Sequence, residues 1–253
     1  MGNLGRAGFV ARDVAHVLYR VLPSYSGLSV VGIMVGPGDM LRWLEAGAPD
    51  APPAPLPAGG VFAEYQERAW TWRPRGLAVA EFIRRVYTRV IRPIEVRYDA
   101  AQWMGRARAQ RAAAARMIDD VPPAAAMIES FEAALEDAVG AVEAAGARAV
   151  LIRQPRWIKE RFTPDEEALL WNGANANVFR GVEPTAYYST RVMYALLDEL
   201  DAAMQRVAAR HGARFVDPMP AIPMTAESFY DHFHLTPAGS EALARAVAEA
   251  FVD

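Results

Sequence analysis

Hydrophobic residues form two kinds of pattern along this chain. Apolar residues recur every three or four positions from about residue 10 to 21, at 124–145, at 186–210 and after residue 237, which predicts amphipathic helices. Two continuous apolar runs, at 28–35 and 149–152, are typical of strands buried on both faces of a parallel sheet. Residues 214–217 predict a third, short strand. Helices and strands in this order predict right-handed parallel α/β units.

The segment between the first strand and the helix at 124 departs from this pattern. Residues 47–60 are rich in proline and glycine, which predicts a loop or linker. From there the chain is rich in aromatic residues and then in arginine, and 77–92 and 98–118 predict two helices separated by Pro93. We interpret residues 61–122 as a helical insertion in a single domain that spans residues 1–253. Its arginines could bind an anionic group, or they could form a solvated helix face.

Size and composition exclude several classes of protein. With 253 residues, 53% of them hydrophobic, the chain can bury a full core. A formal net charge of −3 gives no argument for a nucleic-acid partner, and the absence of cysteine excludes disulfides and thiolate chemistry. No apolar run approaches the roughly 20 residues that a membrane-spanning helix needs. The N-terminus lacks the pattern of a signal peptide, so the cytoplasm is the default expectation for a protein of unknown localisation.

The nonapeptide that ends at Gly239 carries the clearest candidate chemistry. Thr236 is a predicted N-cap and Pro237 a first helical residue, so the downstream end of the preceding loop is fixed. In that loop Asp231 would orient the imidazole of His234, which would take a proton from a hydroxyl nucleophile. The alternative is that Asp231 is a turn residue and His234 a partly buried polar side chain. No second cluster of metal ligands accompanies His232 and His234, so we predict no metal site.

The same nonapeptide resembles the final motif block of the SGNH (GDSL-type) hydrolases, a family of esterases, lipases and acyl-group hydrolases. The segment from Asn3 to Gly8 resembles the second block, in which the N–H of the glycine helps to form the oxyanion hole. The four residues from Gly36 resemble the third block, G-x-N-D, with Gly38 in place of the asparagine that donates to the oxyanion. Losing one such donor costs roughly 100- to 1,000-fold in rate. Asp39 matches the aspartate of that block and, like Gly36 and Asn3, is expected to be structural.

This resemblance implies the fold and the activity. It implies a three-layer, flavodoxin-like α/β fold with a mainly parallel sheet. It also implies hydrolysis of an acyl or acetyl ester of a lipid, a carbohydrate or a small molecule through a covalent acyl-enzyme. In that reaction His234 would be general base and then acid, Asp231 its orienting carboxylate, and Gly8 an oxyanion donor. The resemblance implies no metal and no organic cofactor.

One block of the family is not found in this sequence. That first block is a G-D-S motif that carries the nucleophilic serine, and no serine here follows a strand in a Gly-Asp-Ser context. The serines are Ser24, Ser26, Ser29, Ser130, Ser189, Ser228 and Ser240. Either the given start lies inside a longer gene, so that the fold is N-terminally incomplete, or the protein has abandoned hydrolysis. We favour the first explanation, which predicts that the strand at 28–35 is an exposed apolar edge.

Two other functions remain open from the sequence. A non-catalytic protein of the same fold could hold an anionic partner in its pocket or on its arginine-rich helices. An acyltransferase would need the same residues as an esterase and differs only in the acyl acceptor.

Overall fold

The computed structural model describes residues 4–5, 8–51, 92–178 and 181–251. Two parallel sheets lie in these ranges. The larger has the strand order β1 (Val30–Ile33), β3 (Arg148–Ile152), β5 (Arg214–Val216). The smaller pairs β2 (Met117–Ile118) with β4 (Tyr187–Tyr188).

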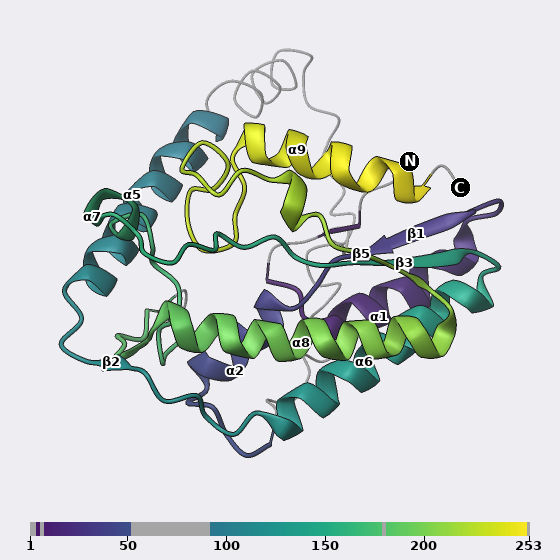
Figure 1. Cartoon of the computed structure of the whole chain (residues 1–253), viewed down its shortest axis with the longest axis horizontal. Coiled ribbons are helices and arrows are strands. Elements are labelled where there is room, and N and C mark those ends of the chain that lie inside the picture. The colour runs from purple at the N-terminus through teal and green to yellow at the C-terminus, as the bar shows by residue number, and fades with distance from the viewer. Residues whose placement is uncertain (1–3, 6–7, 52–91, 179–180, 252–253) are drawn as a thin grey trace, which may run out of the picture.

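Helices cover both faces of the larger sheet (Figure 1). The first face carries α1 (Ala11–Val21), α6 (Ala125–Ala144) and α8 (Thr190–His211). The second carries α9 (Pro237–Ala248) and the short 3-10 helix η5 (Glu249–Phe251). The protein therefore has the three layers of a mixed α/β fold, compatible with the flavodoxin-like architecture of SGNH proteins, as the sequence predicted.

Alternate residues of the central strand face the two helical layers. Ala149 and Leu151 belong to the large core that α1, α6 and α8 form, whereas Val150 and Ile152 pack with Ala250 on the other face. All four strand residues are buried because both faces of β3 are covered. This double cover explains why the apolar run at 149–152 is continuous and does not alternate.

The remaining helices lie in the segments that connect these elements along the chain. They are α2 (Pro37–Glu45), α5 (Arg92–Ala112), α7 (Pro164–Glu167) and the 3-10 helices η1 (Leu22–Ser24) and η4 (Met219–Ala221). The sequence pattern does not predict α2, because its start resembles a turn. The predicted helix at 98–118 corresponds only in part to α5, because α5 ends at Ala112 and residues 117–118 form the strand β2. Pro93, predicted to separate two helices, is instead the second residue of α5, a position where proline needs no backbone N–H partner. Residues 77–91 of the other predicted helix lie outside the described ranges.

The position of β1 bears on the edge-strand expectation. β1 is an edge of the described sheet, and Val30 and Val31 are half-buried while Gly32 is exposed. This agrees with the expected exposed edge, but the absence of an upstream sequence block stays a prediction. So does the division into one domain with an insertion at 61–122. Within the described ranges, no helix has both the length and the apolar character that crossing a membrane requires.

Candidate active site

Two backbone hydrogen bonds close the segment Ser228–Thr236 of the loop that follows β5. The N–H of Tyr230 donates to the carbonyl of His234 at 3.1 Å, and the N–H of Thr236 donates to the carbonyl of Ser228 at 2.9 Å. Oγ1 of Thr236 accepts a hydrogen bond from the N–H of Gly239 at 3.2 Å, so Thr236 is the N-cap of α9 that the sequence predicted. A Cβ at Gly239 would lie 2.1 Å from the carbonyl oxygen of Ser228, so only glycine permits this close approach.

Asp231 and His234 form a hydrogen-bonded pair in this loop. Nδ1 of His234 lies 2.8 Å from Oδ2 and 3.0 Å from Oδ1 of Asp231. The backbone N–H groups of Phe233 and His234 donate to Oδ1, both at 2.9 Å, and the indole Nε1 of Trp171 donates to Oδ2 at 2.6 Å. Asp231 is 0% exposed, whereas the side chain of His234 is 48% exposed. A fully buried carboxylate thus orients an imidazole whose Nε2 is available for proton transfer.

Both members of the pair have shifted pKa values. Burial alone would raise the pKa of Asp231, but the hydrogen bond and charge of His234, together with the two backbone donors, outweigh it and the pKa is lowered. Burial alone would lower the pKa of His234, yet the hydrogen bond and negative charge of Asp231 raise it above the ordinary 6.5. His234 is therefore a stronger base than a free imidazole, which suits it to accept a proton from a hydroxyl.

Two aromatic rings lie parallel to the imidazole of His234. The ring centroid of Trp171 is 6.1 Å away at an interplanar angle of 8°, and that of Tyr230 is 5.4 Å away at 12°. Trp103 of α5 packs edge-on against Trp171, with the centroids 5.0 Å apart. The sequence does not indicate Trp171 as a site residue, because Trp171 lies 60 residues before Asp231 and belongs to no local motif. The indole therefore contacts both members of the pair, as a donor to Asp231 and as a ring parallel to that of His234.

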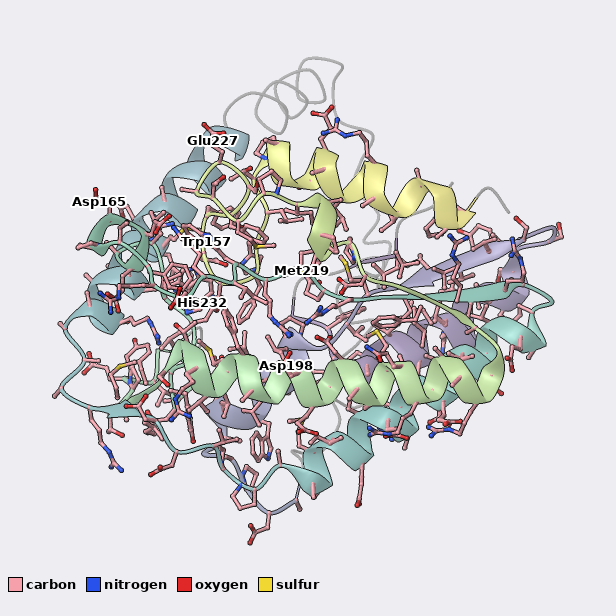
Figure 2. All side chains as sticks on the ribbon, in the orientation of Figure 1. Trp157, Asp165, Asp198, Met219, Glu227 and His232 are labelled. Atoms are coloured by element: carbon pink, nitrogen blue, oxygen red, sulfur yellow. The ribbon has the colours of Figure 1, made fainter. Side chains whose placement is uncertain are left out.

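His232, the other histidine of the loop, is fully buried. Its Nε2 lies 3.2 Å from Oγ1 of Thr190 at the start of α8, and its Nδ1 lies 3.5 Å from Nδ2 of Asn172. Burial lowers the pKa of His232 well below 6.5, so the ring is neutral. Figure 2 shows it beside the end of α8 toward which the strands of the sheet point. His232 therefore joins the loop to α8 and to residues 169–172, called here the Trp171 segment. In the described ranges, no group of three or more His, Asp or Glu residues could hold a metal ion.

Asp39 is a capping residue in this structure. Both of its carboxylate oxygens lie 3.1 Å from the N–H of Ala11, at the start of α1. Burial raises the pKa of Asp39 to about 7 despite these bonds. Gly36 precedes α2 with a φ of +133°, a conformation that favours glycine. Asn3 lies outside the described residues.

The two glycines expected to serve the oxyanion lie near one another at the start of α1. A Cβ at Gly38 would come within 2.4 Å of the carbonyl oxygen of Phe9, the residue after Gly8. The carbonyl of Gly8 accepts from Nη2 of Arg42 at 3.2 Å. Among the described residues, no hydrogen bond joins either glycine to the Asp231–His234 pair. Their role as oxyanion donors stays a prediction.

This close approach makes asparagine unsuitable at position 38. Replacing Gly38 with asparagine, the residue of the third SGNH block, is expected to destabilise the protein by about 1–3 kcal/mol, because the Phe9 backbone must move away from the new Cβ. Thermal or urea denaturation measures this loss. Gly105→Asn is the matched control, since nothing lies within 4 Å of a Cβ there. Equal stability of the Gly38 and Gly105 variants would show that the Phe9 segment moves without cost.

The chain also matches a known protein family. A family model described as "SGNH domain (fused to AT3 domains)" matches residues 93–249, more than half of the chain. The chain belongs to the SGNH family. The match includes α5, Trp171 and the Asp231–His234 pair of this SGNH protein. No curated protein and no solved structure matched the chain.

Family membership confirms the resemblance that the final block indicated. It also suggests a hydrolase-like or acyltransferase-like function and a small-molecule substrate for this SGNH protein. The residues expected to form the second and third blocks precede the matched range. These are Asn3, Gly8, Gly36, Gly38 and Asp39.

Proposed function

We propose that this SGNH protein hydrolyses an ester of an acyl or acetyl group, with His234 as general base and acid and Asp231 as its orienting carboxylate. The observation that supports this proposal is the pairing of a fully buried carboxylate with a half-exposed imidazole. Hydrogen bonds from Trp171 and from two backbone N–H groups hold the carboxylate in place. A turn aspartate with no further task would not need so many buried donors.

The mechanism moves one proton in each half-reaction. Nε2 of His234 takes the proton of a hydroxyl as its oxygen attacks the ester carbonyl carbon, and a tetrahedral intermediate forms. The imidazolium then gives that proton to the leaving alkoxide as the ester C–O bond breaks, which leaves an acyl-enzyme. Water attacks in the same way and releases the acid. Asp231 stays ionised throughout and stabilises the imidazolium.

The proposal requires a hydroxyl nucleophile next to Nε2. No hydroxyl of a described residue forms a hydrogen bond with this atom. Ser189 instead caps α8, where its Oγ accepts from the N–H of Val192 at 3.4 Å, and Ser228 is buried. We propose that the nucleophile is a serine in a Gly-Asp-Ser context encoded upstream of the given sequence.

The test is hydrolysis of p-nitrophenyl acetate. It compares the chain as given with a chain extended upstream in the same reading frame, each with and without His234→Ala. Activity in the extended chain that is lost with His234→Ala is expected, and a fluorophosphonate label should then locate the nucleophilic serine by mass spectrometry. A silent extended chain, or an upstream frame without Gly-Asp-Ser, would refute the proposed esterase.

Acyl transfer to an acceptor other than water is the second candidate. It is favoured by the description of the matched family, which names a fusion to AT3 domains, a class of acyltransferases. Adding an alcohol to the assay separates the two candidates, because transfer yields a new ester while hydrolysis yields only the free acid. Binding of an anionic partner by the arginine-rich helices is less supported, since Arg108 and Arg111 donate to backbone carbonyls inside the protein.

A further inference from the structure

The mechanism above does not use the arginines of α5 that face the protein. Arg108 and Arg111 lie three residues apart and so project from one face of the helix. Nε of Arg108 donates to the carbonyl oxygen of Leu169 at 3.1 Å, and its Nη2 donates to the carbonyl oxygen of Tyr230 at 2.8 Å. A single guanidinium therefore binds two segments that are far apart in the sequence.

Arg111 holds the same region from the next turn of the helix. Its Nη1 donates to the carbonyl oxygens of Asn172 at 2.5 Å and Tyr188 at 3.1 Å. Its guanidinium also lies 5.6 Å from the ring centroid of Tyr187, a cation–π distance. Burial lowers the pKa of Arg111 to about 10, so the side chain is still a cation at neutral pH. The two arginines thus bind backbone carbonyls that precede and follow Trp171 in the sequence.

The segments that Arg108 joins are the ones that hold the catalytic pair. Trp171 lies between the bound carbonyls of Leu169 and Asn172 and donates to Asp231. The bound carbonyl of Tyr230 directly precedes Asp231, and the Tyr230 ring lies parallel to the imidazole of His234. The distance between these segments sets where the Trp171 indole meets the carboxylate of Asp231. A planar guanidinium fork holds two acceptors in a fixed relative geometry, whereas the ammonium of lysine is a compact charge with rotatable donors.

We propose that Arg108 is a positioning residue that holds the Trp171 segment and the Tyr230 carbonyl where Asp231 and His234 can act as a general base. This inference rests on the proposed function of the pair. The competing explanation is that Arg108 only anchors α5 to the rest of the protein. That explanation predicts a loss of stability in Arg108 variants without a change in the properties of His234.

The test compares Arg108→Ala and Arg108→Lys with the control Arg106→Ala, because Arg106 is exposed on the same helix. The first readout is the NMR titration of the His234 imidazole, which needs no turnover. Besides Asp231, the titratable groups Tyr230 and His232 lie close to it. Both stay uncharged near neutral pH, because burial raises the pKa of Tyr230 and lowers that of His232. The second readout is kcat and KM of the catalytically active form.

In both Arg108 variants we expect the His234 titration to move down toward 6.5, because the contact with Asp231 that raises its pKa loosens. We expect kcat to fall by about 10- to 100-fold with a smaller change in KM, since misplaced catalytic groups slow the chemical step. Arg106→Ala should match the wild type in both readouts.

An unchanged His234 titration in a folded Arg108 variant would overturn the proposal and leave only the anchoring role. If Arg108→Ala fails to fold, Arg108→Lys decides the question, because it keeps the charge and most of the side-chain volume. The titration also separates this proposal from the proposed function. A protein without esterase activity but with a shifted titration would refute catalysis and retain the positioning role of Arg108.

Discussion

Replacing His234 with alanine is expected to lower kcat for ester hydrolysis by about 10³- to 10⁴-fold in the catalytically active form of the protein. Without the imidazole the attacking hydroxyl loses the base proposed to take its proton. The fold should persist, because the side chain of His234 is about half exposed and contributes little to the core. His234→Asn is a cleaner variant, since its Nδ2 can still donate to the buried carboxylate although it cannot act as a base. The measurement is steady-state hydrolysis of p-nitrophenyl acetate together with thermal denaturation.

The pH dependence of the wild type tests the same assignment. A general base must be neutral, and Asp231 raises the pKa of His234 above 6.5. Activity is therefore expected to rise with pH through a midpoint above 6.5, and to be low where the imidazole is protonated. His211→Gln is the matched control, because this histidine lies at the opposite end of α8 between Glu136 and Glu143. Wild-type activity of His234→Asn, or a midpoint that follows His211, would contradict the assignment of His234 as the base.

The parts of this structure that the sequence predicted are those that local patterns determine. The run at 149–152 predicts a strand buried on both faces, and Thr236 with Pro237 predicts the start of α9. Asp231 and His234 are three residues apart, so one closed loop brings them together and a short motif can mark them. Period and spacing carry such information because each depends on neighbours within a few residues.

Contacts between distant segments could not be predicted in this way. Trp171 reaches Asp231 across 60 residues, and Arg108 reaches the Tyr230 carbonyl across 122. The sequence favours a solvated helix face for these arginines over an anion site, because it does not show which side of the helix meets the loop. Every residue has a backbone carbonyl, so the residue types do not indicate which carbonyl accepts a hydrogen bond from an arginine. The contacts that surround Asp231 and His234 could therefore be found only in the structure.

Replacing Asp231 with asparagine is expected to reduce kcat by about 10³- to 10⁴-fold while the geometry of the loop is largely kept. The asparagine carbonyl can take the place of Oδ1 and accept from the N–H groups of Phe233 and His234. Its amide would then take the place of Oδ2, which accepts from Trp171 and His234 in the wild type. An NH₂ group at that position faces two donors, so it cannot replace the carboxylate there.

The imidazole can relieve this conflict by changing its tautomer. With Nδ1 as the acceptor from the asparagine amide, the proton moves to Nε2, and the ring can no longer take a proton from the nucleophile. Loss of the negative charge should also return the pKa of His234 toward 6.5, so the acidic limb of the pH profile moves to lower pH as kcat falls. The pH–rate profile measures this shift, and ¹⁵N NMR of the imidazole reports which nitrogen carries the proton. An active Asp231→Asn variant with Nδ1 still protonated would show that Asp231 does not set the tautomer, and the pair would be a structural contact.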